Sequence, residues 1–399
     1  MTISSSFPVI RMLPNKSPQR VRFGAPWVYA DEVVLDRRAR KHAPGTIVEL
    51  QANDGERLGL CAFNPVSKII CRMLDRDLSA VIDRDWLVAK LTYAQDMRAR
   101  LYDAPYYRLI HAEADGLPGV VIDRFGDVAV IQPNAAWAEV LIDDLAAALI
   151  EVTGVTTVVK NGTGRARSLE GLAEETVVLA GEVSDAVPVQ MNGATYFADL
   201  TQGQKTGLFL DQRDNQAFAA RLAKGGTVLD VFSHVGGFAL AALAAGAVSA
   251  DAIDGSAPAL DLAMRGASAS GFAGQFATIK GDAFEVMAGL QADHRRFDMV
   301  VCDPPAFAPN KNALDAGLRA YERIARLGAG LTTKGGYLVV CSCSHAADLN
   351  SFREASIRGI GRAGRKGQLI HTGAAGPDHP MHPSLAETGY LKALFFRLE

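Results

Sequence analysis

Two residues able to do covalent or hydrogen-bonding chemistry follow apolar stretches in the C-terminal half of the chain. Asp303 comes directly after the apolar run 297–302, and Cys343 comes shortly after the run 336–340. A thiolate can add to an electron-poor carbon atom, and a carboxylate on a turn stiffened by Pro304 and Pro305 can orient a polar ligand. We therefore predict Cys343 and Asp303 as catalytic residues. The alternative for Cys343 is an inert buried thiol, which is the commoner fate of a cysteine.

Further polar residues and a glycine turn follow neighbouring apolar stretches. Asp254 stands where an acid can accept hydrogen bonds from both hydroxyls of a ribose, and Asp282 stands where it can bind a polar group of a base. The glycine turn lets the backbone approach a ligand with no Cβ in between. Alternatively, Asp282 and Ser256 cap the helices that they begin. The predicted cofactor-binding residues are Phe232, Ser233, Gly236, Gly237, Asp254, Ser256, Asp282, Ala283 and Asp303.

The elements that position these residues are expected to alternate between strand and helix. We predict buried parallel strands at 227–231, 247–253, 276–280, 297–302 and 336–340. Ligands of open α/β sheets bind at the carboxyl ends of the strands, where all the candidate residues fall. The fold class expected for residues 190–399 is α/β, with a doubly wound Rossmann-like sheet. The order of the strand-end motifs resembles that of class I S-adenosylmethionine-dependent methyltransferases.

A polar stretch precedes the first of these strands. Its Gln-Lys-Thr-Gly and Asp-Gln-Arg sequences, within 203–213, are very similar to a motif that precedes the cofactor fold in the same family. The resemblance implies that Lys205, Asp211 and Arg213 line the cofactor and substrate cleft. We expect Lys205 and Arg213 to reach a phosphate or the methionine carboxylate. The alternative is a capping network for the following helix, predicted over 215–223.

The N-terminal part of the chain predicts two smaller modules. Short apolar stretches separated by turns indicate a small β-barrel over residues 1–75. A linker helix and an α+β middle domain are expected over residues 76–189. The sequence around Arg22 and Trp27 resembles the RNA-binding PUA domain of bacterial ribosomal-RNA methyltransferases, which implies RNA contacts for both residues. Trp27 could stack on a base, although a lone Trp is more often a core or domain contact.

Composition limits the class of protein. The 399 residues are 49% hydrophobic and 21% charged, which indicates a globular protein of two or three domains. No apolar run is long enough to span a bilayer, and the first residues lack the pattern of a signal peptide, so we expect a cytoplasmic protein. Five cysteines without a Cys-x-x-Cys pattern argue against disulfides and a zinc site. The net charge of −3 does not indicate nucleic-acid binding, but basic stretches at 11–41 and 353–366 could bind phosphate.

Taken over the whole chain, the sequence resembles the bacterial 23S ribosomal-RNA cytosine-5 methyltransferases with an N-terminal PUA domain. Ser342-Cys343-Ser344, the Asp303-Pro-Pro-Ala-Phe307 loop, and Asp378-His-Pro and Tyr390-Leu-Lys near the C-terminus carry the resemblance. It implies S-adenosyl-L-methionine as cofactor and ribosomal RNA as partner, with Pro304, Pro305 and Phe307 against the base. Two positions depart from the family pattern: Ala306 replaces a Lys, and His234-Val235 replaces Tyr-Thr.

The chemistry explains why a thiol is decisive. Carbon 5 of a pyrimidine is a poor nucleophile until a thiolate adds at carbon 6. A rival interpretation is methylation of an exocyclic base nitrogen by Asp303 and Phe307, with Cys343 inert. Two others are a nicotinamide-dependent oxidoreductase, against which the missing Gly-x-Gly-x-x-Gly counts, and a non-catalytic RNA-binding protein. A homodimer is left open, and no membrane or metal partner is expected.

Overall fold

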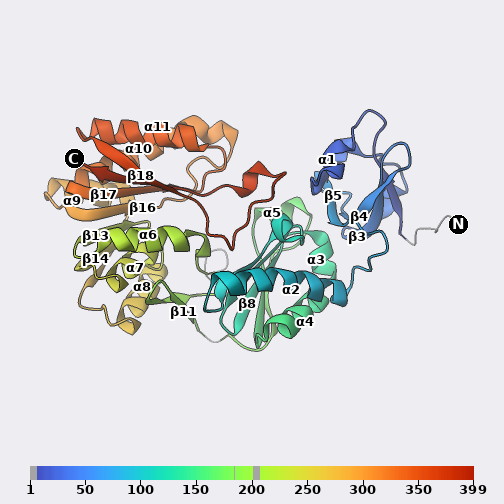
Figure 1. Ribbon diagram of the computed structural model, residues 1–399, viewed down its shortest axis with the longest axis horizontal. Coiled ribbons are helices and arrows are strands. Elements are labelled where there is room, and N and C mark those ends of the chain that lie inside the picture. Colours follow the sequence, from blue (N-terminus) through green and yellow to red (C-terminus); the bar gives the residue numbers. More distant parts are fainter. Residues whose placement is uncertain (1–6, 184, 201–206) are drawn as a thin grey trace. The chain divides into compact units, whose positions relative to one another are not determined.

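The computed structural model describes residues 7–183, 185–200 and 207–399, which form two compact units (Figure 1). Unit 1 consists of Met1–Asp185, Leu200–Gly207 and Asp378–Thr388, and unit 2 consists of Ala186–Asp199, Leu208–Pro377 and Gly389–Glu399. The chain therefore leaves unit 2 near its C-terminus, contributes one segment to unit 1 and returns. Among the described helices, none combines the length and the apolar character that crossing a membrane requires.

The first sheet of unit 1 is a half-barrel with the strand order β1-β3-β4-β5-β2. β1 pairs with β3 in parallel, and the other neighbours are antiparallel. Its inner face buries residues such as Val48, Phe63 and Ile70 completely, as the predicted small β-barrel requires. The elements are β1 Val9–Arg11, α1 Gln19–Arg22, β2 Trp27–Tyr29, η1 Ala30–Glu32, η2 Ala39–Lys41, β3 Thr46–Gln51, β4 Arg57–Phe63 and β5 Ile69–Asp75.

The second sheet of unit 1 has the order β10-β9-β8-β7-β6 and is covered by α2 and α4. The helix α2 begins after its N-cap Asp83, whose side chain accepts a hydrogen bond from the amide of Trp86. Leu141 leaves the helical conformation and divides the helical region that follows β8 into α3 and α4. The elements are α2 Arg84–Leu101, β6 Tyr106–His111, η3 Ala112–Asp115, β7 Val120–Phe125, β8 Val128–Pro133, α3 Ala136–Val140, α4 Ile142–Thr153, β9 Thr157–Gly162, α5 Arg165–Leu169 and β10 Glu175–Ala180.

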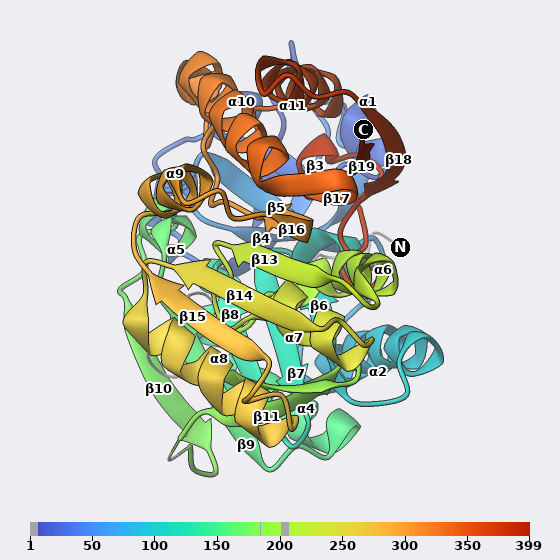
Figure 2. The same cartoon turned by 90° about the vertical axis from the view of Figure 1, so that its left-hand side faces the viewer.

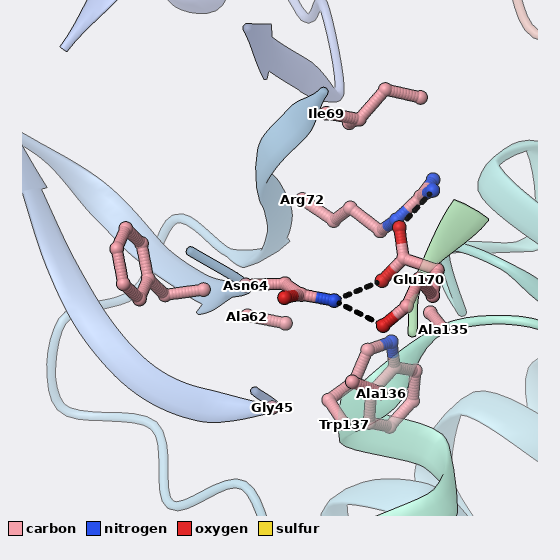
Figure 3. A pocket seen from close by; sticks show the side chains of 10 residues that line it. Gly45, Ala62, Asn64, Ile69, Arg72, Ala135, Ala136, Trp137 and Glu170 are labelled. Carbon is pink, nitrogen blue, oxygen red and sulfur yellow. Dashed lines mark hydrogen bonds and ion pairs between the residues drawn. The ribbon is translucent and has the colours of Figure 1, made fainter. Parts of the chain in front are cut away.

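A buried polar network joins the two sheets of unit 1 (Figure 3). The carboxylate of Glu170, which is 3% exposed, accepts hydrogen bonds from Asn64, Ser67 and Arg72 at 2.7 to 3.0 Å. Arg72 also pairs with Glu113 at 2.9 Å. Figure 3 shows Asn64 and Arg72 reaching from the half-barrel toward Glu170. Because buried charges are stable only when paired, this network fixes the half-barrel against the middle sheet.

The C-terminal segment of unit 1, residues 378–388, is anchored by a second charged cluster. Arg98 is fully buried and forms two bonds to Asp115 at 2.6 and 2.7 Å. Its guanidinium also donates to the backbone oxygen of Asp378 at 2.8 Å. The carboxylate of Asp378 accepts from the amide of Arg108 and contacts the ring of His379. The Asp-His-Pro motif near the C-terminus thus has a structural role inside unit 1.

Unit 2 contains a seven-stranded sheet with the order β15-β14-β13-β16-β17-β19-β18 (Figure 2). The first five strands are parallel, and β19 and β18 complete the sheet antiparallel. The two-stranded hairpin of β11 and β12 precedes it. The strands are β11 Val187–Met191, β12 Ala194–Ala198, β13 Thr227–Val231, β14 Ser249–Asp254, β15 Phe276–Lys280, β16 Phe297–Cys302, β17 Thr332–Ser342, β18 Gly367–Gly373 and β19 Lys392–Leu398.

Helices cover both faces of this sheet, which confirms the predicted doubly wound α/β fold. α9, α10 and α11 pack on one face around a core that includes Val231, Met287 and Phe352. α6, α7 and α8 pack on the other face (Figure 2). The helices are η4 Leu210–Gln212, α6 Arg213–Ala223, α7 Gly237–Ala244, α8 Ala257–Ala269, α9 Ala283–Ala292, η5 Lys311–Ala313, α10 Leu314–Leu331, α11 Leu349–Arg362 and η6 Ala386–Thr388, the last of which belongs to the unit 1 segment.

The network around Glu170 gives a test of unit 1. Replacing Glu170 with Gln should lower the free energy of unfolding of this unit by about 1.5–3 kcal/mol, because Arg72 loses one of its two carboxylate partners. All three tryptophans of the chain, Trp27, Trp86 and Trp137, lie in unit 1, so urea unfolding followed by tryptophan fluorescence reports on it selectively. The control is Glu174→Gln on the exposed surface, which should leave the midpoint unchanged. Equal midpoints for both variants would contradict the prediction.

Candidate functional site

The register of the parallel strands brings the predicted site residues to one edge of the sheet. Val231 is paired with Ile253 on one side and with Cys302 on the other, and Cys302 is paired with Val340. The residues that follow these positions on the four strands must therefore emerge side by side. Asp254, Asp303 and the turn that begins at Phe232 lie on this edge, together with the end of β17 that leads to Cys343.

The turn between β13 and α7 has an unusual backbone. Phe232, His234 and Gly236 have φ angles of 63°, 51° and 79°. Left-handed conformations cost non-glycine residues of the order of 1–2 kcal/mol each and cluster at binding sites. A Cβ on Gly237 would lie 2.4 Å from the Gln216 amide nitrogen, so a larger residue there would require the Gln216 side chain to move. The chain thus holds a tight, strained turn at the predicted cofactor site.

Asp230 holds this turn in place through hydrogen bonds. Its Oδ2 accepts hydrogen bonds from the amides of Phe238 and Ala239 at 3.2 and 3.0 Å. These two amides in the first turn of α7 are therefore not free to bind a ligand. Burial raises the pKa of Asp230 to about 7. Sequence reasoning missed Asp230 as a site residue, although an acid inside the apolar run 227–231 was a visible signal.

Asp254 connects the turn to the neighbouring strand. Its two carboxylate oxygens accept from the amides of His234 at 2.9 Å and Ser256 at 2.8 Å. Each oxygen keeps a second lone pair, which is the acceptor that ribose hydroxyls require. Asp254 is half-buried. The geometry therefore holds this carboxylate in a fixed position at the edge of the sheet.

Buried polar atoms show that the site fits a polar ligand. Within the described ranges, Asp211 Oδ1, Asp230 Oδ1 and Ser233 Oγ are buried and have no hydrogen-bond partner. Such orphaned groups are costly unless a ligand or water satisfies them. The second oxygen of Asp211 accepts from the hydroxyl of Tyr390 at 2.6 Å, which fixes its carboxylate. An amino-acid end with hydrogen-bond donors matches these acceptors.

Two of the predicted cofactor residues have the capping role that was the alternative. Asp282 accepts from the amides of Phe284 and Glu285 at the start of α9, and its side chain is exposed. Ser256 accepts from the amide of Ala259 at the start of α8. Capping uses one oxygen of Asp282 and leaves the other for a ligand, so the capping role and the predicted base-binding role are compatible.

The loop after β16 places Asp303 and Phe307 at the same edge. The amide of Asp303 donates to the backbone oxygen of Val231 at 3.1 Å, which ties this loop to β13. Phe307 is half-buried, with ring centroids 6.3 Å from Phe232 and 5.0 Å from Tyr321. Pro305 is exposed. An aromatic floor and an exposed proline are suited to a flat base.

Cys343 is the one partly exposed cysteine of the five in the chain. Cys302 and Cys341 are fully buried, and burial raises the pKa of both thiols. The strand β17 ends at Ser342, so Cys343 lies outside it. Cys341 lies within β17, and of the five cysteines only Cys343 is accessible to a substrate.

A hydroxyl network holds the turn around Cys343. Ser342 and Ser344 are fully buried, and both side chains bond to the hydroxyl of Tyr321 on α10, at 2.8 and 2.7 Å. Ser344 Oγ also accepts from the amide of Ala308 at 2.8 Å. The network therefore ties the Cys343 turn to the Asp303 loop. Tyr321 was not predicted from the sequence, because an aromatic residue on an amphipathic helix reads as core.

The remaining predicted RNA-binding residues have mixed outcomes. Lys205 lies outside the described residues. Arg22 forms an ion pair with Glu56, and the indole N–H of Trp27 donates to Glu113 at 2.8 Å, which is the domain contact that was the alternative for Trp27. In unit 2, the arginines of the basic stretch at 353–366 are engaged internally: Arg353 with Asn350, Arg358 and Arg362 with Glu322, and Arg365 with backbone oxygens.

Comparison with known families agrees with this site. Residues 165–397 match the family model of S-adenosylmethionine-dependent methyltransferases, and residues 12–76 match that of PUA-like domains. S-adenosylmethionine is therefore the cofactor, as predicted, and the orphaned acceptors and the strained turn are the features of the site that fit it. Its methionine end would be held by Asp211, Asp230 and Ser233, and its ribose by Asp254.

Comparison with individual proteins extends over the whole chain. A protein of Aliivibrio fischeri (strain MJ11) named ribosomal RNA large subunit methyltransferase I is 36% identical over 378 residues, covering 94% of this chain and 95% of the relative. A Deinococcus radiodurans protein named ribosomal RNA large subunit methyltransferase is 32% identical and covers 99% of both chains.

Solved structures share the fold. A Streptococcus mutans protein described as a SAM-dependent methyltransferase has a TM-score of 0.80, with 18% identity over 98% of this chain and 100% of that chain. The crystal structure of SMU.776, described as a methyltransferase complexed with SAH, has the same TM-score and identity and covers 98% of this chain and 99% of that chain. With the family matches and the relatives above, the chain belongs to the ribosomal RNA large subunit methyltransferase I family and is an S-adenosylmethionine-dependent methyltransferase with an N-terminal PUA-like domain.

Proposed function

We propose that this methyltransferase acts on 23S ribosomal RNA and methylates carbon 5 of a cytosine, with Cys343 as the covalent nucleophile. The observation that carries the proposal is the position of Cys343. It is the partly exposed cysteine, and the Tyr321 network ties its turn to the Asp303 loop at the carboxyl edge of the sheet. The names of its relatives support the choice of ribosomal RNA as the substrate. Because ribosomal RNA is a cytoplasmic molecule in bacteria, this substrate implies that the protein acts in the cytoplasm.

The proposed reaction begins at the Cys343 sulfur. The thiolate adds to carbon 6 of the cytosine, and the displaced electron pair makes carbon 5 nucleophilic. S-adenosylmethionine, when bound, would supply an electrophilic methyl group, and its transfer to carbon 5 would break the bond between that methyl and the sulfonium sulfur and leave S-adenosylhomocysteine. A base then removes the carbon-5 proton, and the electrons of that bond expel Cys343 as a thiolate and restore the ring. The protein's share is to hold the sulfur, the base and the methyl donor in one geometry.

Asp303 and the aromatic floor have the complementary task of holding the base. A carboxyl group at Asp303 can hydrogen-bond to the polar edge of the cytosine while Phe307 and Pro305 contact its flat face. A base inside a duplex has to leave the stack to reach such a site. We propose that the PUA-like half-barrel binds the RNA backbone, with exposed basic residues of the stretch 37–41 as its phosphate contacts.

Methylation of a base nitrogen is the second candidate. The Asp303-Pro-Pro-Ala-Phe307 loop favours it, because an acid, two prolines and an aromatic residue suit amino-group methylation without a thiol. The two candidates differ in one respect that can be measured. Only the carbon-5 reaction needs the sulfur of Cys343.

The role of Asp254 predicts a change in cofactor affinity. Asp254→Ala removes the acceptor for the ribose hydroxyls, so the Kd for S-adenosylhomocysteine should rise about 10- to 100-fold, equivalent to the loss of about 1.5–3 kcal/mol. Isothermal titration calorimetry measures this. The matched control is Asp261→Ala on the exposed face of α8, which should bind normally. An unchanged Kd for Asp254→Ala would remove Asp254 from the site.

The raised pKa of Asp230 predicts a pH dependence of cofactor binding. With a folded-state pKa of about 7, Asp230 is protonated at pH 6, and the ammonium group of the cofactor should displace that proton. Affinity should therefore rise with pH up to about 7 and then level off. Calorimetry at pH 6 in buffers of different ionisation enthalpy should show proton release. In Asp230→Asn, which keeps the α7 cap, both effects should vanish; their persistence would show that another group titrates.

The covalent step predicts that Cys343 is indispensable. Cys343→Ala should abolish 5-methylcytidine formation, whereas Cys341→Ala, two residues away and fully buried, should retain it. The measurement is nucleoside analysis of unmethylated 23S ribosomal RNA after incubation with a labelled methyl donor. RNA containing 5-fluorocytidine should trap a covalent complex with wild type and not with Cys343→Ala. A labelled N-methyl base, or undiminished 5-methylcytidine in Cys343→Ala, would favour the nitrogen reaction or another nucleophile.

A further inference from the structure

A buried lysine stands next to the candidate nucleophile. Lys392 is the first residue of β19 and is paired with Ser342 of β17, the residue before Cys343. It is 8% exposed. Its ammonium donates to the backbone oxygens of Ser344 at 2.8 Å and Ala347 at 2.7 Å. A buried lysine is costly, so its retention at this position requires compensation.

The two hydrogen bonds allow Lys392 to hold the backbone next to Cys343. Ser344 directly follows Cys343, and Ala347 ends the same turn. The ammonium therefore clamps the turn from the β19 side, while Tyr321 holds Ser342 and Ser344 from the α10 side. Cys343 is fixed between the two clamps. Backbone carbonyls alone compensate a full positive charge only in part.

The charges around the turn indicate that Lys392 also acts on Cys343 electrostatically. Burial lowers the pKa of Lys392, and the negative charges of Cys343 and Asp348 oppose that effect, so the ammonium lies within electrostatic reach of the sulfur. Asp348 is exposed and also caps α11. Among the described residues, Tyr321 is also within electrostatic reach of Cys343, and the exposed His345 follows Cys343 two residues later in the chain. A carboxylate disfavours a thiolate, and a cation held at low dielectric favours it.

We propose that Lys392 is a positioning residue for the nucleophile, holding the turn that carries Cys343 and supplying the positive charge that stabilises its thiolate. The inference rests on the proposed function, in which the thiolate attacks the base. Lys392 touches neither base nor cofactor in this role and acts through the sulfur.

Alkylation of Cys343 by iodoacetamide tests the charge directly, because it needs no RNA and no methyl donor. The other four cysteines are fully buried, and mass spectrometry of the peptide carrying residues 341 and 343 assigns the site. Lys392→Gln removes the charge and keeps N–H donors for the two carbonyls. It should shift the pH midpoint of alkylation upward by about one unit, with alkylation at pH 7 about tenfold slower.

Two further variants separate charge from packing. Lys392→Arg keeps the charge and should alkylate as wild type does, and Lys334→Met, an exposed lysine at the other end of β17, should change nothing. Methyl transfer by Lys392→Gln should fall at pH 7 and recover at higher pH. If Lys392→Gln slows methyl transfer while the alkylation midpoint stays in place, the charge has no role and the proposal is overturned.

The role of Lys392 and the proposed covalent mechanism can be tested separately. Should Cys343→Ala keep its methyl transfer, the covalent mechanism is wrong, whereas the alkylation midpoints still decide whether Lys392 stabilises the thiolate. Thermal unfolding and cofactor affinity of each variant show whether it is folded. Should Lys392→Gln be unfolded, Lys392→Met provides the neutral variant, and the same shift is expected from it.

Discussion

The alignment of the parallel strands in unit 2 is the constraint on which the site depends. Val231, Ile253, Cys302 and Val340 lie in register across four neighbouring strands, so the residues after them emerge at one edge. A shift of one residue in any pair would turn its side chains to the opposite face of the sheet. The apolar cores on both faces prevent such a shift, because it would expose buried valines and leucines. The packing of the sheet therefore fixes the positions of the candidate site residues.

Buried polar groups then set the details of that edge. Asp230 holds the start of α7 and the strained turn above it, and Tyr321 and Lys392 hold the turn of Cys343 from two sides. Each of these groups is expensive to bury, and a merely stable fold would do better with apolar residues. The three side chains have in common that each forms hydrogen bonds at this edge of the sheet, to a loop or to the start of the helix that follows it. These groups hold the loops of the site in one conformation, and this pre-organisation offsets the free-energy cost of burying them.

Unit 1 shows the same principle in a different role. Glu170 and Arg98 are buried ions and Arg72 is largely buried. Their partners lie on different elements, including the segment 378–388, which lies between β18 and β19 in the sequence. Trp27, which could stack on a base, instead donates to Glu113 within this system. The charged residues most visible in the sequence are thus partly structural, so the proposed RNA contacts are assigned to the exposed ones.

The sequence by itself determined the fold class and the positions of the five parallel strands along the chain, because apolar runs that end in acids or glycines are typical of a parallel sheet whose ligand edge is known. The spatial order of the strands and the antiparallel strands β18 and β19 came from the tertiary structure. It determined Asp254, Asp303 and Cys343 as candidates for the same reason. Only the tertiary structure decided which cysteine is accessible, which arginines are already paired, and that Asp282 and Ser256 cap helices. The roles of Tyr321 and Lys392 could not be found from local sequence, because their partners lie 21 to 48 residues away. Periodicity describes neighbours along the chain, whereas burial and charge compensation depend on neighbours in space.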